Sequence, residues 1–404
     1  MPSLFEDGPE YKARLSKPYE LPAVTLKDIH NAVPKHLHKK NTLKGVRYAL
    51  RDAFFCYSLY QLAKFIDPSI TYLSTSTRFH PFTLSLLKWT LWSTYWFFQS
   101  LLINHTIGYI AHTFILAPYW AWRHSHHLHH KTTGSMERDE NYVPKTRSEL
   151  KMASGDMMKR ADYEEIFGET PIWTLGRMLV MQLMGWQLYL TYNTLGSPMY
   201  PPGTNHWSPS SALFKKSDRV PILFTNTLLF TWISILGLWT YNTSISTFVK
   251  YYFIPYLFTN HWIVMFTFLH HTDPTMPHFR KDTWTFLRGA VTTVDRPLLG
   301  WMGRFFLHNI SHDHVAHHFF SGIPFWNGPE LSEHVRKAMG SDYNGDSTNT
   351  FRALYRSFTQ CEFVEDDGDI IMWKNKKGEA ARKIAGTIEV PLSGDQSAEA
   401  DRSQ

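Results

Sequence analysis

Residues 220–274 have the sequence VPILFTNTLLFTWISILGLWTYNTSISTFVKYYFIPYLFTNHWIVMFTFLHHTDP. Before Asp273 this segment holds a single charged residue, Lys250, which divides it into two charge-free runs. A helix that spans a lipid bilayer needs about 20 predominantly apolar residues. Residues 221–240 and 251–269 each meet this length, although a soluble core can hold such helices too. Because two of them flank one lysine, the segment favours a membrane hairpin.

Further stretches without charge lie nearer the N-terminus. No Asp, Glu, Lys or Arg occurs between Lys88 and Arg123, and residues 53–63 form a shorter apolar run. Trp and Tyr recur in these stretches, as expected of rings at headgroup depth. Residues 174–193 are interrupted by Arg177 and two glutamines, so we expect them to lie in the membrane interface. The sequence therefore predicts an all-α, polytopic integral membrane protein with about four transmembrane helices and a cytosolic, histidine-rich helical cap.

The composition excludes two classes of protein. Aromatic residues make up 16% of the 404 residues and charged residues 19%, whereas disordered chains have few aromatics and much charge. Cys56 and Cys361 are the only cysteines, which excludes a disulfide scaffold. The basic residues of segment 35–47 belong either to a solvated arm or to a segment held against anionic headgroups. We expect a cytosolic N-terminal arm (1–50), a membrane domain (51–330) and a cytosolic C-terminal segment with a disordered end (331–404).

Two histidine motifs share one spacing. His126-x-x-His129-His130 recurs as His314-x-x-His317-His318. With 22 histidines in 404 residues, one such match is expected by chance about 0.06 times. On a helix, offsets of three and four residues put all three imidazoles on one face. Such a face is poorly suited to an apolar core and well suited to metal binding.

A third histidine element, His270-His271, ends the apolar run 251–269. Only one of two adjacent histidines can face a given site, and the alternative interpretation is an interfacial histidine at a helix end. The two motifs must lie on the same side of a membrane to share a site, so an even number of crossings must separate them. The hairpin of residues 221–240 and 251–269 supplies two crossings, which predicts that the motifs meet.

The number of imidazoles narrows the choice of metal. Six or seven neutral imidazoles without a thiolate exceed the four ligands of a tetrahedral zinc ion. Imidazole also suits iron and copper. A nitrogen-rich pair of irons could activate dioxygen against an inert C–H bond, which zinc, having no redox states, cannot do. The Glu-x-x-His pairs of carboxylate di-iron bundles do not occur in this sequence.

Several of these motifs together resemble the membrane-bound fatty acid desaturases, most of all the fungal and plant delta-12 (oleate) group. Residues 122–130 (WRHSHHLHH) resemble the second histidine box of that family, and residues 134–140 (GSMERDE) with Val143-Pro144 resemble the stretch after it. Residues 308–318 (HNISHDHVAHH) resemble the third box, and residues 269–274 (LHHTDP) resemble the segment before it. The resemblance covers most of the chain.

One family motif has no counterpart in the sequence. The family has a first box, His-Glu-Cys-Gly-His or similar, which does not occur here. The chain passes directly from Gln99-Ser100 to Asn104-His105, which resembles an internal deletion, a missed exon or a splice variant. His105 and His112 are the candidates to replace the missing ligands. They share a helical face but are separated by roughly 10 Å along its axis.

The resemblance implies a di-iron enzyme that uses dioxygen and external electrons to introduce a double bond into a fatty acyl chain. It implies a multi-pass protein of the endoplasmic reticulum membrane, with its termini and histidine boxes in the cytosol. Because no His-Pro-Gly-Gly haem-binding motif is present, cytochrome b5 and its reductase are the implied electron donors. The implied iron ligands are His126, His129, His130, His271, His314, His317 and His318.

Other functions remain open at the level of sequence. Acyl hydroxylases, acetylenases and conjugases share the metal ligands and differ in substrate placement. The missing first box favours a catalytically inactive relative that binds lipid or a partner desaturase. A membrane zinc hydrolase is the third class, but the sequence has no His-Glu-x-x-His.

Overall fold

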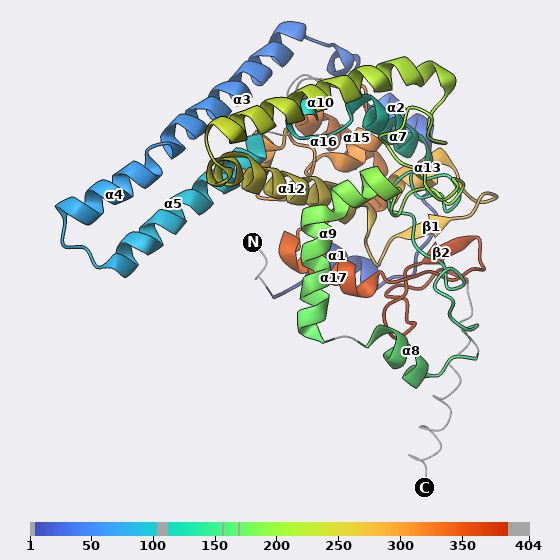
Figure 1. The fold of residues 1–404 in the computed structure, drawn as a ribbon. Coiled ribbons are helices and arrows are strands. Elements are labelled where there is room, and N and C mark those ends of the chain that lie inside the picture. Colours follow the sequence, from blue (N-terminus) through green and yellow to red (C-terminus); the bar gives the residue numbers. More distant parts are fainter. Residues whose placement is uncertain (1–4, 103–111, 156, 169, 387–404) are drawn as a thin grey trace.

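The computed structural model describes residues 5–102, 112–155, 157–168 and 170–386, and these are mostly helical (Figure 1). The longer helices are α3 (Thr42–Ala63), α4 (Ile66–Ser76), α5 (Pro81–Leu102), α7 (Tyr119–Thr132), α9 (Pro171–Tyr192), α10 (Arg219–Asn242) and α12 (Ile254–His271). The shorter helices are α1 (Pro9–Leu15), α2 (Leu26–Ala32), α8 (Arg160–Phe167), α11 (Ile245–Phe248), α13 (Phe286–Val291), α14 (Trp301–Phe306), α15 (His314–Phe319), α16 (Gly328–Met339) and α17 (Thr350–Gln360). Two short strands, β1 (Pro277–Phe279) and β2 (Ile370–Met372), pair antiparallel, so the prediction of an essentially helical protein is confirmed.

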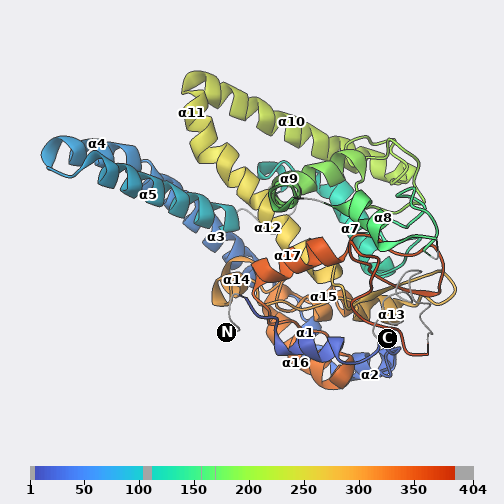
Figure 2. The same ribbon diagram turned by 90° about the horizontal axis from the view of Figure 1, so that it is seen from below.

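The predicted hairpin is present as two antiparallel helices. α10 and α12 are joined by α11 and by a π-helix, Val249–Phe253 (Figure 2). α12 packs against both α9 and α5, and its residues Trp262, Met265 and Leu269 belong to the largest buried apolar cluster. α12 is therefore the central helix of the fold, and its C-terminal end delivers the His270-His271 pair.

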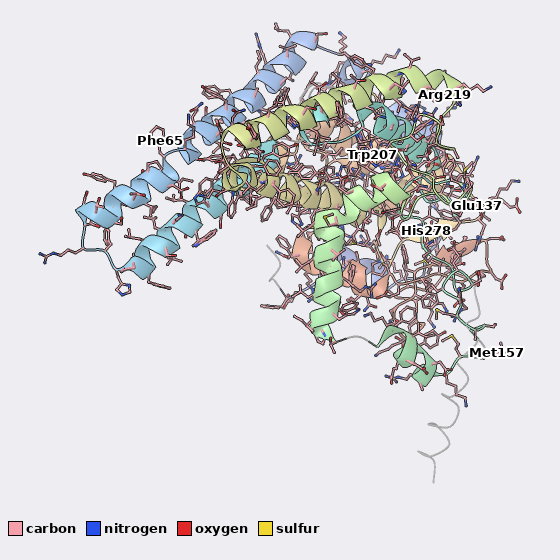
Figure 3. All side chains as sticks on the ribbon, in the orientation of Figure 1. Phe65, Glu137, Met157, Trp207, Arg219 and His278 are labelled. Carbon is pink, nitrogen blue, oxygen red and sulfur yellow. The ribbon has the colours of Figure 1, made fainter. Side chains whose placement is uncertain are left out.

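A second helical hairpin extends away from the rest of the protein (Figure 1). Asn41 caps the N-terminal end of α3 by accepting a hydrogen bond from the Lys44 N–H, and both α3 and α4 pack against α5. Phe65 lies at the bend between α3 and α4 and is exposed (Figure 3). This hairpin is tied to the α10–α12 hairpin by Asp67, which binds Lys250 Nζ at 2.5 Å and Lys88 Nζ at 3.2 Å.

The surface of α10 is apolar. Val220, Phe230 and Leu238 are largely exposed along its length. By length and composition, one helical stretch among the described residues, Lys216–Asn242, could cross a membrane.

A helical cap covers the histidine-bearing end of α12. Its core joins α2, α13, α15 and α16 through side chains such as Ile29, Val291, Val315 and Val335. Residues 328–386 are folded onto this cap, where β2 pairs with β1 in the register Pro277↔Met372. The predicted disordered end includes residues 387–404, which lie outside the described part of the chain.

Candidate metal centre

Three separate elements bring the predicted histidines together. α7 carries the first motif, α15 carries the second, and the C-terminal end of α12 carries the third element. All seven predicted ligands converge at the junction of these helices: His126, His129, His130, His271, His314, His317 and His318. The prediction that the two motifs meet is thereby confirmed.

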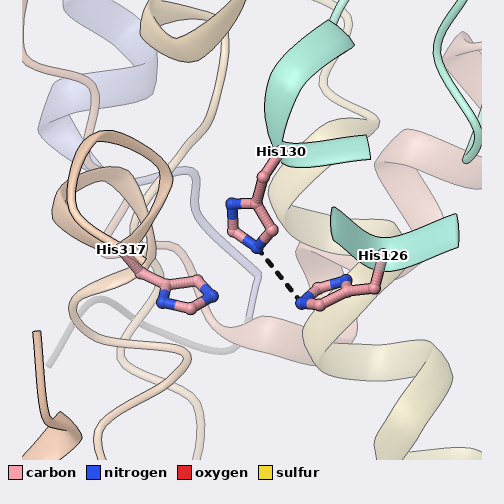
Figure 4. A group of neighbouring side chains, drawn as sticks. All are labelled: His126, His130 and His317. Atoms are coloured by element: carbon pink, nitrogen blue, oxygen red, sulfur yellow. Dashed lines mark hydrogen bonds between the residues drawn. The ribbon is translucent and has the colours of Figure 1, made fainter. Parts of the chain in front are cut away.

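The histidines form two groups of three, and within each group one nitrogen per residue lies within 4.8 Å of the others. The first group is His126, His130 and His317, in which the Nε2 atoms of His126 and His130 are 3.1 Å apart (Figure 4). The second group is His129, His271 and His318. His314 adjoins the second group, because its Nε2 lies 3.0 Å from that of His271 and 3.3 Å from that of His318.

The donor atoms fit a pair of metal ions. His317 Nε2 is buried without a hydrogen-bond partner among the described residues, and the Nε2 atoms of the other ligands point at one another. A buried imidazole nitrogen without a partner is costly, and a metal ion supplies that partner. Two groups of three nitrogens, with a seventh beside them, match two ions better than one tetrahedral zinc.

Further contacts fix the orientation of the rings. Asp139 Oδ1 lies 2.6 Å from His129 Nδ1, and Asp139 itself accepts hydrogen bonds from the Gly134 N–H and the Asn141 N–H. Thr133 Oγ1 lies 3.1 Å from His318 Nδ1. Such contacts to Nδ1 direct Nε2 toward the metal. Asp139 and Thr133 were not predicted as site residues, although Asp139 lies in the 134–140 stretch that resembles the family.

Burial keeps five of the predicted ligands neutral. Burial, followed by the neighbouring imidazoles, lowers the pKa of His126, His130, His314 and His318 well below the ordinary value. Burial lowers the pKa of His317 to about 4. At pH 7 these side chains therefore carry free lone pairs, which is the form that ligates a metal.

His270 and His271, the adjacent pair at the end of α12, have different surroundings. His270 Nδ1 lies 2.5 Å from the Val294 carbonyl oxygen, and His270 Nε2 lies 3.1 Å from Ser311 Oγ. Both nitrogens of His270 are thus occupied, whereas His271 belongs to the second group of three. The choice of His271 over His270 agrees with this geometry.

The structure describes one of the two histidines that were candidates to replace the ligands of the first box. His105 lies outside the described residues. The His112 ring lies tilted against Trp122 at 4.9 Å between ring centroids, and Trp122 stacks on His126 at 4.8 Å. His112 belongs to neither group of three. Its contact with the predicted ligands is indirect, through the Trp122 indole that lies against His126.

An ion-pair network supports the end of α12 that carries His271. Arg296 donates through Nε to the Leu269 carbonyl at 2.8 Å and through Nη2 to Asp273 at 2.7 Å. Arg296 also pairs with Asp346, and Arg14 reaches Asp273 from the N-terminal arm at 3.5 Å. Buried charges are tolerated when they are paired and hydrogen-bonded, as these are. The network holds together segments that are hundreds of residues apart in the sequence.

A mostly apolar cavity of about 540 Å³ opens beside the first group of histidines. His126, Trp122 and Tyr142 line one part of it, and α9 lines its length from Trp173 to Tyr189. Its volume lies within the range of ligand-binding cavities. An apolar chain placed in this cavity would lie next to the metal ligands.

Comparisons with known proteins agree with this site. The sequence profile of the fatty acid desaturase family matches residues 96–348. The chain is 34% identical over 393 residues to the delta(12) fatty acid desaturase of Mortierella isabellina, covering 90% of this chain and 94% of that protein. It is 32% identical over 413 residues to an oleate hydroxylase of Claviceps purpurea, covering 90% and 83%. It is 30% identical over 391 residues to a protein of Brassica juncea named omega-6 fatty acid desaturase, endoplasmic reticulum, covering 89% and 94%.

These matches define the class of the protein. The chain belongs to the fatty acid desaturase family, whose members are oxidoreductases. The names of its relatives support a function of the desaturase type and do not favour an inactive lipid-binding protein. The sequence-based assignment to this family is confirmed.

Proposed function

We propose that this chain is a membrane di-iron fatty acyl desaturase of the delta-12 type. The observation that carries the proposal is the convergence of two groups of three histidines beside an apolar cavity that reaches His126. The relatives named delta-12 desaturases support the regiochemistry.

The residues that would hold the metals follow from the two groups. His126, His130 and His317 would ligate one iron, and His129, His271 and His318 the other, with His314 beside the second. Two irons bound there would supply the redox chemistry that lets dioxygen attack an unactivated C–H bond. The first histidine box remains absent from the sequence, so this ligand set is smaller than that of the family.

The protein's own residues have three tasks in this proposal. The cavity wall formed by α9 and α12 orients the acyl chain and excludes water from it. Trp122, stacked on His126, separates the metal centre from His112. Asp139 accepts a hydrogen bond from His129 Nδ1–H and so holds the ring in the orientation that presents Nε2.

We further propose how the protein lies in the cell. Its exposed apolar helices would form about four crossings of the endoplasmic reticulum membrane, with the helical cap and both termini in the cytosol. The divisions at residues 1–50, 51–330 and 331–404 belong to this proposal. Cytochrome b5 and its reductase would deliver electrons to the cytosolic face.

A second candidate within the same class is an acyl hydroxylase. The similarity to the Claviceps purpurea oleate hydroxylase, only slightly lower than that to the Mortierella desaturases, favours it over the acetylenase and conjugase alternatives. Hydroxylation and desaturation would use the same ligands, so the product alone distinguishes them.

Expression in a yeast strain that makes no dienes tests the proposal. Fatty-acid profiling should show a new double bond at position 12, whereas a hydroxylated product would favour the second candidate. Metal analysis of the purified protein should give close to two irons per chain. One iron or none, together with an unchanged fatty-acid profile, would instead support the inactive relative. The genomic sequence between Gln99 and Asn104 would show whether an exon with a first box exists.

A further inference from the structure

One face of α9 forms a long wall of the apolar cavity. Residues on this face recur every three or four positions, as expected of a helix side that lines a cavity: Gly176, Arg177, Val180, Met181, Gly185 and Tyr189. From Trp173 to Tyr189 the 1.5 Å rise per residue makes this wall about 24 Å long. The cavity is therefore elongated along the helix, as a site for one extended acyl chain must be.

Two positions on this wall carry no side chain. A Cβ atom at Gly176 would meet no heavy atom within 4 Å. A Cβ atom at Gly185 would lie 3.5 Å from Val264 Cγ2 and 3.6 Å from Met181 Cγ, which are ordinary contacts with two other lining residues. Neither glycine is required by close packing of the backbone, and glycine weakens a helix interior. The absence of side chains at both positions leaves space in the cavity itself.

The polar groups of the wall indicate what occupies this space. Arg177, adjacent to Gly176, lines the end of the cavity near Trp173, and its guanidinium pairs with Glu362 at 3.9 Å and lies over the Phe358 ring. At the other end the cavity reaches His126. The volume between them is bordered by aliphatic and aromatic groups. This arrangement suits an acyl chain that extends along α9 toward His126.

We propose that Gly176 and Gly185 are specificity-determining residues, which keep the α9 wall open so that a long acyl chain can lie along it. The inference rests on the proposed function, since it takes this cavity as the acyl site. The two glycines are nine residues apart, or about 13 Å along the helix. A large side chain at either position divides or narrows the cavity, so it excludes a long chain before a short one.

Binding measurements on the detergent-purified full chain test this inference without requiring catalysis. The probes are tritiated 1-stearoyl and 1-octanoyl lysophosphatidylcholine, which differ only in acyl length. The Gly185→Leu and Gly176→Leu variants should bind the stearoyl probe at least about ten-fold more weakly and the octanoyl probe within about two-fold of the unmodified protein. Gly176→Ala and Gly185→Ala add only a Cβ and should bind both probes within about two-fold.

Gly237→Leu is the matched control, because Gly237 lies in α10 and a Cβ there also meets no heavy atom within 4 Å. It should leave both affinities unchanged. Unchanged stearoyl binding in both leucine variants, or equal loss of both probes with an unaltered melting temperature, would overturn the inference. If a leucine variant fails to fold, its alanine variant and Gly185→Val provide a graded series at the same position.

Fatty-acid profiles in yeast separate this inference from the proposed function. If the unmodified chain makes no new product, the proposed function fails, while the binding experiment still decides the role of the glycines. If the unmodified chain is active, the leucine variants should shift the product from 18-carbon toward shorter acyl chains. An unshifted profile in an active variant would contradict the inference alone.

Discussion

Along α10, Val220, Phe230 and Leu238 expose between 64% and 75% of their surface, whereas in the cap Asp139, Arg296 and Asp346 expose 4% or less. A soluble domain is ordinarily arranged the other way round, with apolar side chains inside and charges outside. Exposed apolar surface of this extent is typical of a membrane or partner interface. These three buried charges are each paired, Asp139 with His129 and Arg296 with both Asp273 and Asp346. The difference indicates that α10 is stabilised by its surroundings, while the cap is stabilised by its internal polar contacts.

The strongest test of the cap is removal of one ligand. His317→Ala should abolish product formation and lower the metal content from about two ions per chain to one or none, because His317 Nε2 has no other partner among the described residues. Fatty-acid profiling and metal analysis provide the two measurements. His127→Ala is the control, since His127 is exposed on α7 and belongs to neither group of three, so it should change neither value. Full activity in the His317→Ala variant would remove that residue from the ligands.

Breaking the ion-pair network tests whether polar contacts stabilise the cap. Arg296→Met leaves the carboxylates of Asp273 and Asp346 without their closest shared cation, so the free energy of unfolding should fall by about 3–5 kcal/mol. Denaturant unfolding in detergent measures it. The control Arg160→Met removes an exposed ion pair on α8 and should cost less than about 1 kcal/mol. Equal stability of the two variants would show that the network contributes little.

A charge on α10 tests the other half of the comparison. Phe230→Arg places a guanidinium on the exposed apolar face, and in a lipid environment this should cost about 2.5–3.5 kcal/mol of insertion free energy. A membrane-insertion assay with engineered glycosylation sites measures the inserted fraction. Leu150→Arg in the connector before α8 is the control and should have little effect. Unimpaired insertion of the Phe230→Arg variant would indicate that this face does not contact lipid.

A smaller effect is expected from the carboxylate behind His129. Asp139→Asn removes the negative charge 2.6 Å from His129 Nδ1, and metal affinity should fall by about 10–100-fold. Competition with a chelator measures the affinity. Glu137→Gln is a suitable control, because the carboxylate it removes pairs with Arg280 at 3.6 Å and not with a histidine. An affinity unchanged by Asp139→Asn would show that the His129 ring is oriented by packing alone.

Per pH unit, the smallest effect comes from one buried histidine. Burial lowers the pKa of His206 to about 3, below the value of about 6.5 expected in the unfolded chain. Between these values the unfolded state binds more protons, so stability is present above pH 6.5 and is lost as pH falls toward 3. His206→Gln should reduce this dependence by up to about 1.4 kcal/mol per pH unit, measured by unfolding at several pH values. His127→Gln, at an exposed position, should reduce it much less.

The sequence predicted the parts of the site that repeat and missed those that depend on packing. Six of the seven histidines were identifiable because His126-x-x-His129-His130 recurs at 314–318, and His271 because the His270-His271 pair ends an apolar run. The hairpin was identifiable because only Lys250 interrupts that run. The Arg296 network has no such pattern, since its members come from four separate segments. The cavity was equally hidden, because it requires α7, α9 and α12 to be placed together. Composition also gave no sign that α16 supplies part of the cap core or that α17 packs against α12.

The contact between the two ends of the described chain has a consequence for biosynthesis. Arg382 donates through Nε to the Lys17 carbonyl at 2.9 Å, across 365 residues of sequence. The Tyr19 N–H donates to the Lys383 carbonyl at 2.6 Å. At ~5–20 residues per second, the ribosome needs roughly 20–70 seconds to make the partner of Lys17. Until residues 382 and 383 have been made, Lys17 and Tyr19 lack these partners, so this part of the N-terminal arm can dock only after the ribosome has synthesised the segment that carries them.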